Sequence, residues 1–332
     1  RIKLLGRMDV IEKRRPQDGR IKTRNAGGQE IELRLSTLPT AFGEKLVMRI
    51  FDPEVVVKTL PELGFPVDDA LRWDALTKRP HGIILVTGPT GSGKTTTLYT
   101  TLKALATSEV NVCSVEDPIE MVEASFNQMQ VNHGIDLTFA DGVRALMRQD
   151  PDIIMVGEIR DLETAEMAIQ AALTGHLVLS TLHTNDAPSA VMRLLELGVP
   201  YYLLETTLIG IMAQRLVRTL CTHCKSPDGQ VADDVWATLA ENWNVPKPAN
   251  VYHPVGCPEC RQTGYRGRTG LYELLTVTQP FSKLIQTETD IHALKQQSIS
   301  DGMKPLRLAG ALKVLEGVTT VEEVLKVTSA LT

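Results

Sequence analysis

The sequence has few of the features that mark membrane-spanning, disulfide-rich or nucleic-acid-binding proteins. No apolar run approaches the roughly 18 residues that a membrane span needs. Five cysteines in a chain of 332 residues do not suggest a disulfide framework. The formal net charge is −5, whereas a chain that follows nucleic acid usually carries a basic surplus, so no nucleic-acid partner is expected. With 43% hydrophobic residues, the chain can bury an ordinary globular core.

Residues 1–52 predict a small sheet domain. The first 20 residues are basic and resemble a helix up to Pro16, followed by a turn. Apolar and polar residues then alternate, which predicts half-buried antiparallel strands. The apolar positions are Ile31, Leu33, Leu35, Leu46, Met48 and Ile50. Three prolines and a glycine make 53–67 a linker. The chain opens at Arg1 without methionine and with no signal-peptide pattern, so we expect a fragment that lacks its natural N-terminus.

Residues 68–332 predict an α/β domain. Short apolar runs that are typical of strands buried on both faces of a parallel sheet occur at 82–88, 111–117, 152–158 and 176–183. Helix-period segments lie between them and make a doubly wound core. One of them precedes Gly175 and has an apolar stripe of Leu162, Ala165, Ile169, Ala172 and Leu173. Residues 218–268 are rich in Cys, Pro and Gly and predict an inserted module. The chain ends in helices, with a capping-box spacing from Thr320 to Glu323.

Residues 88–95, GPTGSGKT, match the phosphate-binding loop of P-loop nucleotidases. Its glycines let backbone N–H groups face a phosphate at the start of a helix. Lys94 would neutralise the β- and γ-phosphates of ATP, and the Thr95 hydroxyl would hold Mg²⁺. The alternative is a glycine-rich turn with an unrelated lysine, but a strand before the loop and a helix after it favour nucleotide binding. The predicted nucleotide-binding residues are Gly88, Pro89, Thr90, Gly91, Ser92, Gly93, Lys94, Thr95 and Thr96.

Three further strand ends carry polar side chains suited to hydrolysis. Glu158 follows the apolar run at 153–156, where a carboxylate can bind the water shell of the metal or orient the attacking water. Asp152 precedes that run and belongs at the opposite end. The segment 116–120 carries three acids after another strand, although such a segment could also be a solvated turn. His183 follows the last of the four strands, where it could instead be a structural hydrogen-bonding residue. Ligands in open α/β sheets gather at such carboxyl ends.

Four of the five cysteines form two C-x-x-C pairs, Cys221 with Cys224 and Cys257 with Cys260. Paired spacing in turns that contain Pro and Gly is typical of a tetrahedral zinc site. Because all four ligands would be cysteine, the site is expected to be structural rather than catalytic. The alternative is four unpaired thiols. The fifth cysteine, Cys113, lies in a predicted strand and is expected in the core.

Together these segments resemble one family, the ATPases of type II secretion and type IV pilus assembly. The family carries a Walker A loop, an acidic Asp box, a Walker B strand and a His box, which correspond here to 88–95, 116–120, 156–161 and 174–184. The resemblance runs nearly from end to end. It implies a RecA-like P-loop ATPase core, a small N-terminal PAS-like sheet domain and an inserted zinc module with four cysteine ligands. The cysteine module occurs in the assembly and secretion branch, and the segment around it resembles the type II secretion member most.

The resemblance also implies roles for single residues. It makes Glu120 the catalytic glutamate, Glu158 the Walker B acid and His183 the His-box residue. Two arginines of the sheet domain, fifteen positions apart in the family, reach toward the γ-phosphate, and Arg34 and Arg49 have that spacing. On pattern alone, these two arginines could equally belong to a solvated strand face.

The function implied by the resemblance is ATP hydrolysis that powers protein export through assembly of a pseudopilus. Family members form a homo-hexamer in the cytoplasm, at the inner membrane, with a membrane platform protein as partner. A further N-terminal domain, absent from this sequence, docks on a membrane-anchored recruiting protein. Pilus assembly or DNA uptake is an alternative that the sequence leaves open, and a nucleic-acid motor is a more distant one. A small-molecule kinase would need an acceptor pocket, for which we find no motif.

Overall fold

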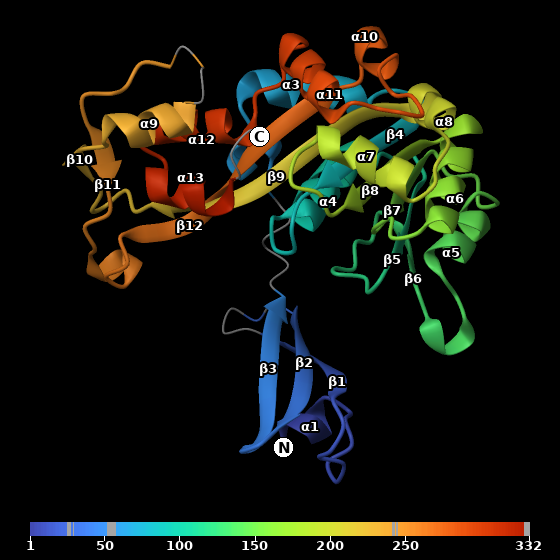
Figure 1. The fold of residues 1–332 in the computed structure, drawn as a ribbon. Coiled ribbons are helices and arrows are strands. Elements are labelled where there is room, and N and C mark those ends of the chain that lie inside the picture. Colours follow the sequence, from blue (N-terminus) through green and yellow to red (C-terminus); the bar gives the residue numbers. More distant parts are fainter. Residues whose placement is uncertain (25–27, 29, 52–57, 241–242, 244, 329–332) are drawn as a thin grey trace. The chain divides into compact units, whose positions relative to one another are not determined.

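The computed structural model describes the chain except for residues 25–27, 29, 52–57, 241–242, 244 and 329–332. Its contacts divide the chain into two compact units, 1–58 and 59–332 (Figure 1). Among the helices of the described residues, none is both long and apolar enough to cross a membrane.

The smaller unit is a three-stranded antiparallel sheet with one short helix. Its elements are α1 (Ile2–Leu5), β1 (Gln17–Arg24), β2 (Glu30–Thr40) and β3 (Gly43–Phe51). The predicted helical character of residues 1–20 is wrong beyond Leu5. The chain leaves the helix after Gly6, because Arg7 has a left-handed φ of 56°. Gly6 itself packs against Leu35, where an added Cβ would lie 2.6 Å from Leu35 Cδ1. The expected turn at 17–19 is instead the start of β1, which pairs with β2 from Gln17 onward.

The strands predicted from alternation are present, but their apolar face is only partly buried. Leu35 is 2% exposed beneath α1, whereas Met48 and Ile50 are 40% and 64% exposed. Leu35 lies opposite Met48 in the β2–β3 register, so these side chains share a face. A four-residue helix covers only part of that face, which is why its other end stays open.

A seven-stranded mixed sheet forms the centre of the larger unit. Its strands, in spatial order, are β12 (Tyr265–Thr276), β9 (Leu208–Leu220), β4 (Gly82–Thr87), β8 (Leu177–Leu182), β7 (Ile153–Val156), β5 (Val112–Glu116) and β6 (Asn127–Gln130). All neighbouring pairs are parallel except β12 with β9. Every residue of β4, β5, β7 and β8 is buried, so the four strands predicted from apolar runs and the α/β class are confirmed.

Helices cover both faces of this sheet. The described helices of the larger unit are α2 (Leu60–Leu63), α3 (Val67–Thr77), α4 (Lys94–Leu105), α5 (Phe139–Leu146), α6 (Leu162–Leu173), α7 (Pro188–Glu196), α8 (Tyr201–Thr207), α9 (Asp233–Ala240), α10 (Gln279–Ser282), α11 (Ile291–Ser300), α12 (Leu306–Leu315) and α13 (Val321–Val327). From β4 the chain passes through α4 to β5 and then to the edge strand β6. It returns through α5 to β7 and through α6 to β8. Right-handed crossovers in opposite directions put α4 on one face and α5 and α6 on the other.

Two details of the predicted helices differ from the structure. The stripe of α6 is buried at Ala165, Ile169 and Ala172, but Leu173 is 56% exposed because the helix ends at this residue. At α13, the Thr320 hydroxyl accepts a hydrogen bond from the Glu323 N–H, as the capping spacing predicted. The Glu323 carboxylate does not close the box, because it binds the Arg218 guanidinium instead.

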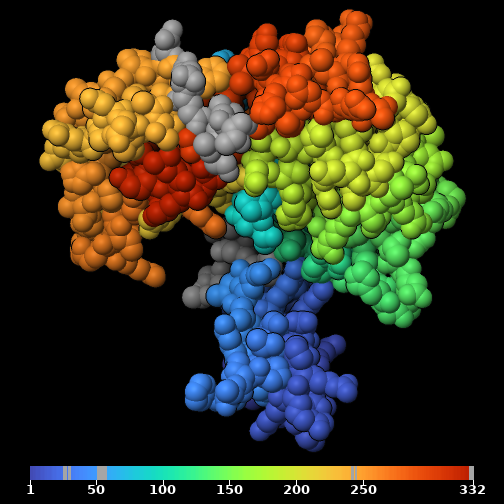
Figure 2. Space-filling view, in the orientation of Figure 1, coloured from blue at the N-terminus to red at the C-terminus, as the bar shows by residue number. Residues whose placement is uncertain are grey.

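The cysteine-rich segment forms a lobe between two long strands. β9 and β12 were not predicted as strands of the sheet, and they enclose residues 221–264. Within that segment lie α9, a two-stranded sheet of β10 (Ser226–Gly229) and β11 (Val251–His253), and a 3-10 turn at Pro258–Cys260. Figure 2 shows this orange segment gathered at one side of the larger unit, with α13 in red packed beside it.

Candidate functional site

The loop at 88–93 joins β4 to α4, as the phosphate-loop motif predicted. Its close packing needs glycine at two positions. Gly88 has φ 148°, and an added Cβ would lie 2.5 Å from the Gln214 carbonyl oxygen. Gly93, the N-cap of α4, has φ 90°, and its Cβ would lie 2.8 Å from Gln214 Nε2. The loop therefore rests on β9 and leads into the start of a twelve-residue helix, where an anion can bind.

Lys94 is folded onto the loop itself. Its Nζ donates hydrogen bonds to the Gly88 carbonyl at 2.7 Å and to the Pro89 carbonyl at 3.2 Å. Burial lowers the pKa of Lys94 to about 8, although the nearby Glu158 carboxylate acts in the opposite direction. The ammonium group therefore stays largely protonated at neutral pH and can exchange its carbonyl partners for phosphate oxygens. Thr95, the predicted magnesium ligand, is exposed in the first turn of α4.

Glu158 and His183 meet at the carboxyl edge of the sheet. His183 Nε2 lies 3.4 Å from Glu158 Oε2, and the other Glu158 oxygen binds the Arg160 guanidinium. Burial lowers the pKa of His183, and the charge of Lys94 adds to this effect, while Glu158 opposes it. The lowered pKa favours the neutral imidazole, in which one ring nitrogen donates and the other accepts a hydrogen bond. Glu158 thus lies near both His183 and Lys94, at the edge of the sheet where the sequence placed these residues.

The Asp box begins next to this group, but its three acids have different surroundings. Asp117 lies close enough to the Arg160 guanidinium to act on it electrostatically. Glu120 is half-buried in the loop that follows β5. Glu116 is only 3% exposed, with its carboxylate bound inside the protein, so it does not face the phosphate loop. Asp152 binds the Asn111 N–H at the opposite end of the strands, as predicted.

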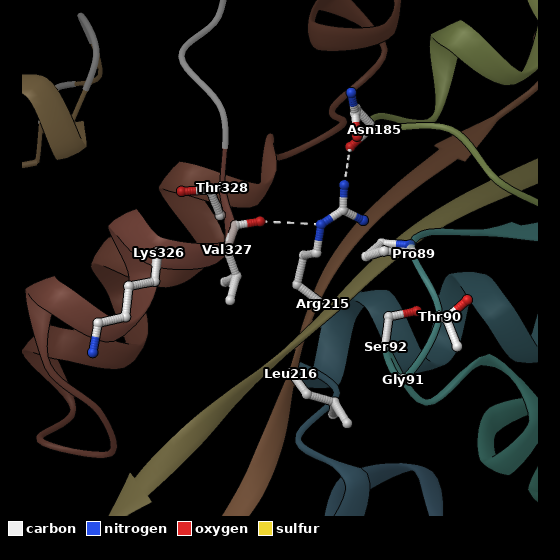
Figure 3. A pocket seen from close by; sticks show the side chains of 10 residues that line it. All are labelled: Pro89, Thr90, Gly91, Ser92, Asn185, Arg215, Leu216, Lys326, Val327 and Thr328. Atoms are coloured by element: carbon white, nitrogen blue, oxygen red, sulfur yellow. Dashed lines mark hydrogen bonds between the residues drawn. The ribbon is translucent and has the colours of Figure 1, made fainter. Parts of the chain in front are cut away.

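A pocket of about 380 Å³ opens beside the phosphate loop (Figure 3). It is lined by Pro89, Thr90, Gly91, Ser92, Asn185, Arg215, Leu216, Lys326, Val327 and Thr328. Arg215 crosses its inner wall, where its guanidinium donates to the carbonyls of Gln214, Asn185 and Val327. These bonds connect β9, on which the phosphate loop rests, with the segment that follows His183 and with the end of α13.

Two further residues of the site, Arg215 and Arg160, were not predicted from the sequence. A signal for Arg215 was available, because Gln214 and Arg215 interrupt the otherwise apolar run at 208–217. Charged residues are rarely buried without a partner, so such an interruption indicates a polar contact inside the fold. Arg160 stands within the Walker B segment, and only the folded structure brings its guanidinium to Glu158.

The smaller unit presents a row of arginines across its sheet. Arg34 lies opposite Arg49 in the β2–β3 register, and Arg20 lies opposite Arg34 in the β1–β2 register. Glu32 shares this face and forms an ion pair with Arg34 at 3.4 Å. Like charges placed directly opposite one another destabilise a sheet, so a surface of this kind is suited to an anionic ligand.

The four paired cysteines converge at the base of the lobe. All their sulfur atoms lie within 4.8 Å of one another, and none forms a disulfide. The Sγ–Sγ distances are 3.8 Å for Cys221 with Cys257, 3.8 Å for Cys224 with Cys260 and 3.7 Å for Cys257 with Cys260. A tetrahedral zinc ion with bonds of about 2.3 Å requires sulfur–sulfur edges of about 3.8 Å, so the cluster fits this ion. Cys113 is fully buried in β5, as expected.

Comparisons with known proteins agree with this geometry. Residues 1–326 match the family model described as "Type II/IV secretion system protein". The chain is 63% identical to the "Type IV pilus assembly ATPase TfpB" of Acinetobacter baylyi, over 98% of this chain and 56% of that protein. It is 50% identical to the "Type II secretion system protein E" of Pseudomonas aeruginosa, over 99% of this chain and 64% of that protein. The chain thus spans only about 56–64% of the length of these relatives.

A solved structure gives the same result for the fold. The pilus retraction motor PilT with bound ADP superposes with a TM-score of 0.68 at 27% identity, over 96% of this chain and 79% of that one. The family match covers nearly the whole chain, from residue 1 to residue 326. This chain belongs to the family of type II/IV secretion system proteins.

Proposed function

We propose that this chain is the ATPase part of a motor that assembles filaments of pilin-like subunits. One observation carries the proposal: Glu158 and His183 lie 3.4 Å apart at the sheet edge where the phosphate loop begins, with the Lys94 charge acting on both. Relatives named as pilus assembly and type II secretion proteins support it. A carboxylate and a neutral imidazole beside a phosphate loop suit water activation and detection of the γ-phosphate.

The residues of the site divide the work of hydrolysis. Lys94 and the loop's N–H groups bind the phosphates, and the adjacent pocket accommodates the nucleoside end of ATP. Magnesium, held by the Thr95 hydroxyl, would neutralise phosphate charge. Glu158 orients the water, Glu120 takes its proton, and His183 senses the γ-phosphate. Arg34 and Arg49 contribute guanidinium groups, whose planar fork pairs with phosphate oxygens.

The machine that we favour is type IV pilus assembly. The segment around the cysteine module resembles the type II secretion member most, and the 50% identity with a type II secretion protein keeps that alternative in view. The higher identity of 63% with a pilus assembly ATPase makes the pilus the better choice. In either machine we propose a hexamer on the cytoplasmic side of the inner membrane. It would act on a membrane platform protein and be held by a membrane-anchored recruiting protein, with no nucleic acid as partner.

Zinc completes the proposal as a structural ion. Cys221, Cys224, Cys257 and Cys260 would hold it, and all four positions of a tetrahedron would then be filled. Such a closed site leaves no position for substrate, so the ion would hold the lobe together and take no part in ATP hydrolysis.

Glu120→Gln tests the assignment of the base. An amide can hold a water molecule but cannot take its proton, so turnover should fall by about 10²–10⁴-fold while ATP binding is kept. A steady-state ATPase assay and a nucleotide-binding titration measure the two effects separately. Turnover at the parent rate would show that Glu120 is not the base.

The two arginines are tested in the same assay on assembled hexamers. Arg34→Ala and Arg49→Ala should each reduce turnover far more than they weaken ADP binding, because ADP lacks the γ-phosphate. Lysine should restore little, since an ammonium group cannot pair with two oxygens at once. Undiminished turnover in both variants would return these residues to a surface role.

The choice between machines is tested in the host cell. Deleting the gene should abolish surface pili and leave exported enzymes in the medium. Loss of the exported enzymes with pili retained would favour type II secretion instead.

A further inference from the structure

The end of β5 contains a buried carboxylate with a complete set of hydrogen-bond donors. Glu116 Oε2 accepts from the Tyr99 hydroxyl at 2.7 Å, and Oε1 accepts from the Ser114 hydroxyl at 2.6 Å and from Gln128 Nε2 at 3.1 Å. Ser114 and Tyr99 are 0% exposed and Glu116 is 3% exposed. A buried charge is costly unless it is well paired, so three donors around one carboxylate hold this arrangement firmly.

The donors come from separate elements of the fold. Tyr99 belongs to α4, the helix that starts at the phosphate loop, and lies one turn beyond Thr95 on the same helix face. Gln128 belongs to the edge strand β6. The network therefore fastens the phosphate-loop helix to the point where β5 ends and the Asp box begins.

The same two side chains hold the far end of the Asp box. Gln128 Nε2 donates to the Met121 carbonyl at 2.9 Å, and Gln128 Oε1 accepts from the Glu123 N–H at 2.7 Å. The Tyr99 hydroxyl also lies 3.0 Å from the Met121 carbonyl. The backbone is thus fixed at Glu116 and again at Met121, immediately after Glu120, so the network determines where the intervening turn can lie.

The Tyr99 hydroxyl keeps its proton under ordinary conditions. Burial raises the pKa of the Tyr99 hydroxyl far above its usual value, and the Glu116 charge raises it further. Its single proton goes to the carboxylate, because a bond to an ionised acceptor is the stronger one.

We propose that Tyr99, Glu116 and Gln128 are positioning residues that set Glu120 relative to the phosphate loop. Movement of α4 on nucleotide binding would then be passed through Tyr99 to the turn that carries the base. This inference rests on the proposed role of Glu120, and none of the three residues touches the reacting atoms in it. A misplacement of about 1 Å at a reacting group can cost up to about 100-fold in rate.

Tyr99→Phe is the test, because it keeps the buried ring and removes only the hydroxyl. We expect kcat to fall by about 10- to 100-fold with the KM for ATP unchanged, and Gln128→Met should act in the same way. Tyr272→Phe is the matched control. Tyr272 is also buried, at 2% exposed, and its hydroxyl donates to the Leu63 carbonyl at 3.0 Å. It also interacts with Thr97 of α4, so it contacts the same helix as Tyr99 but not the Asp box. It should lose similar thermal stability and keep its turnover.

A double variant separates positioning from a general loss of packing. In the Glu120→Gln background, Tyr99→Phe should reduce turnover no further, since there is no longer a base to position. A full additional loss in that background, or equal turnover in Tyr99→Phe and Tyr272→Phe, would overturn the inference while leaving the role of Glu120 intact. A fully active Glu120→Gln would instead overturn the proposed function, and this inference with it.

Discussion

The cysteine lobe and the phosphate loop belong to the same unit but are held in place by different means. The loop and the other strand ends stand on β4, β5, β7 and β8, in which every residue is buried. The strands of the lobe, β10 and β11, have four and three residues, and its base is the set of four converging sulfur atoms. Apolar burial orders the first region, and we expect a metal ion to order the second.

Removing the metal should therefore have the largest effect, confined to the lobe. Closing a structural zinc site contributes on the order of 10 kcal/mol of local folding free energy. Cys257→Ser should lose the ion and loosen residues 218–268, as measured by metal analysis and hydrogen exchange, while ADP still binds at the phosphate loop.

Cys113→Ser is the matched control for this variant. Its thiol is buried in β5 and lies outside the cluster, so the metal content should stay at the parent level. If the purified parent protein contained no zinc, the lobe would not be ordered by a metal ion. If Cys257→Ser lost ADP binding together with the metal, the two regions would not be held in place independently.

A core substitution should show the reverse pattern. Ile154 is 0% exposed in β7, and shortening such a side chain to alanine typically costs about 2–5 kcal/mol. Ile154→Ala should lower the unfolding midpoint in denaturant and leave the metal content unchanged. Leu173→Ala, at a residue that is 56% exposed, should change the stability by no more than about 0.5 kcal/mol. If Ile154→Ala released the metal, the two regions would share one cooperative unit.

In both regions, the sequence was sufficient to predict the parts that depend only on the spacing of neighbouring residues. The phosphate loop and the two cysteine pairs are short patterns whose geometry follows from a few neighbouring residues. The buried position of Glu116 and the contacts of Arg215 depend on partners more than ten positions away, which no local pattern encodes. β9 and β12 were missed for a similar reason, because their pairing at the sheet edge is a long-range choice. Leu173 and Met48 matched an apolar period, but nothing in the described structure covers them completely.

The two regions should also differ in their response to pH, starting with Glu273 on the phosphate-loop side. Its carboxylate accepts hydrogen bonds from the N–H groups of Ala187 and Leu306, at 2.7 and 3.1 Å, and so joins the starts of α7 and α12. Burial raises its pKa to about 7; Asp186 raises it as well, and Arg215 opposes both. A raised pKa in the folded state means that folding favours the protonated form.

The stabilising effect of that proton is present below pH 4.5 and is lost as the pH rises to about 7. Across this window the parent should lose about 1.4 kcal/mol of unfolding free energy per pH unit relative to Glu273→Gln, which does not titrate. Denaturant unfolding at pH 5, 6 and 7 gives the difference. A constant difference between the two proteins would exclude this titration.

Glu323 lies beside the cysteine lobe. Its titration should change the stability less than that of Glu273 and in the opposite direction with pH. Its carboxylate accepts a hydrogen bond from Arg218 Nη2 at 2.7 Å and pairs with Lys326 at 3.0 Å. Arg218 lies three residues before Cys221, the first cysteine of the lobe. The bond from Arg218 lowers the pKa of Glu323 to about 2, although burial acts against it. Its contribution to stability is therefore present above pH 4.5 and is lost as the pH falls toward 2.

The partner of this carboxylate limits the effect, because the side chain of Arg218 is 46% exposed and water screens the pair. Glu323→Gln should cost about 1 kcal/mol at pH 7 and remove part of the loss of stability in acid. Thermal unfolding at pH 7 and pH 3 measures both effects. Glu322→Gln, at the exposed residue next to Glu323 in the first turn of α13, is the control. Because α13 also lines the pocket beside the phosphate loop, this pair is a direct link between the two regions. If Glu323→Gln changed nucleotide affinity as well as stability, the cysteine lobe and the nucleotide site would be coupled through α13. The two regions would then not be stabilised independently of one another.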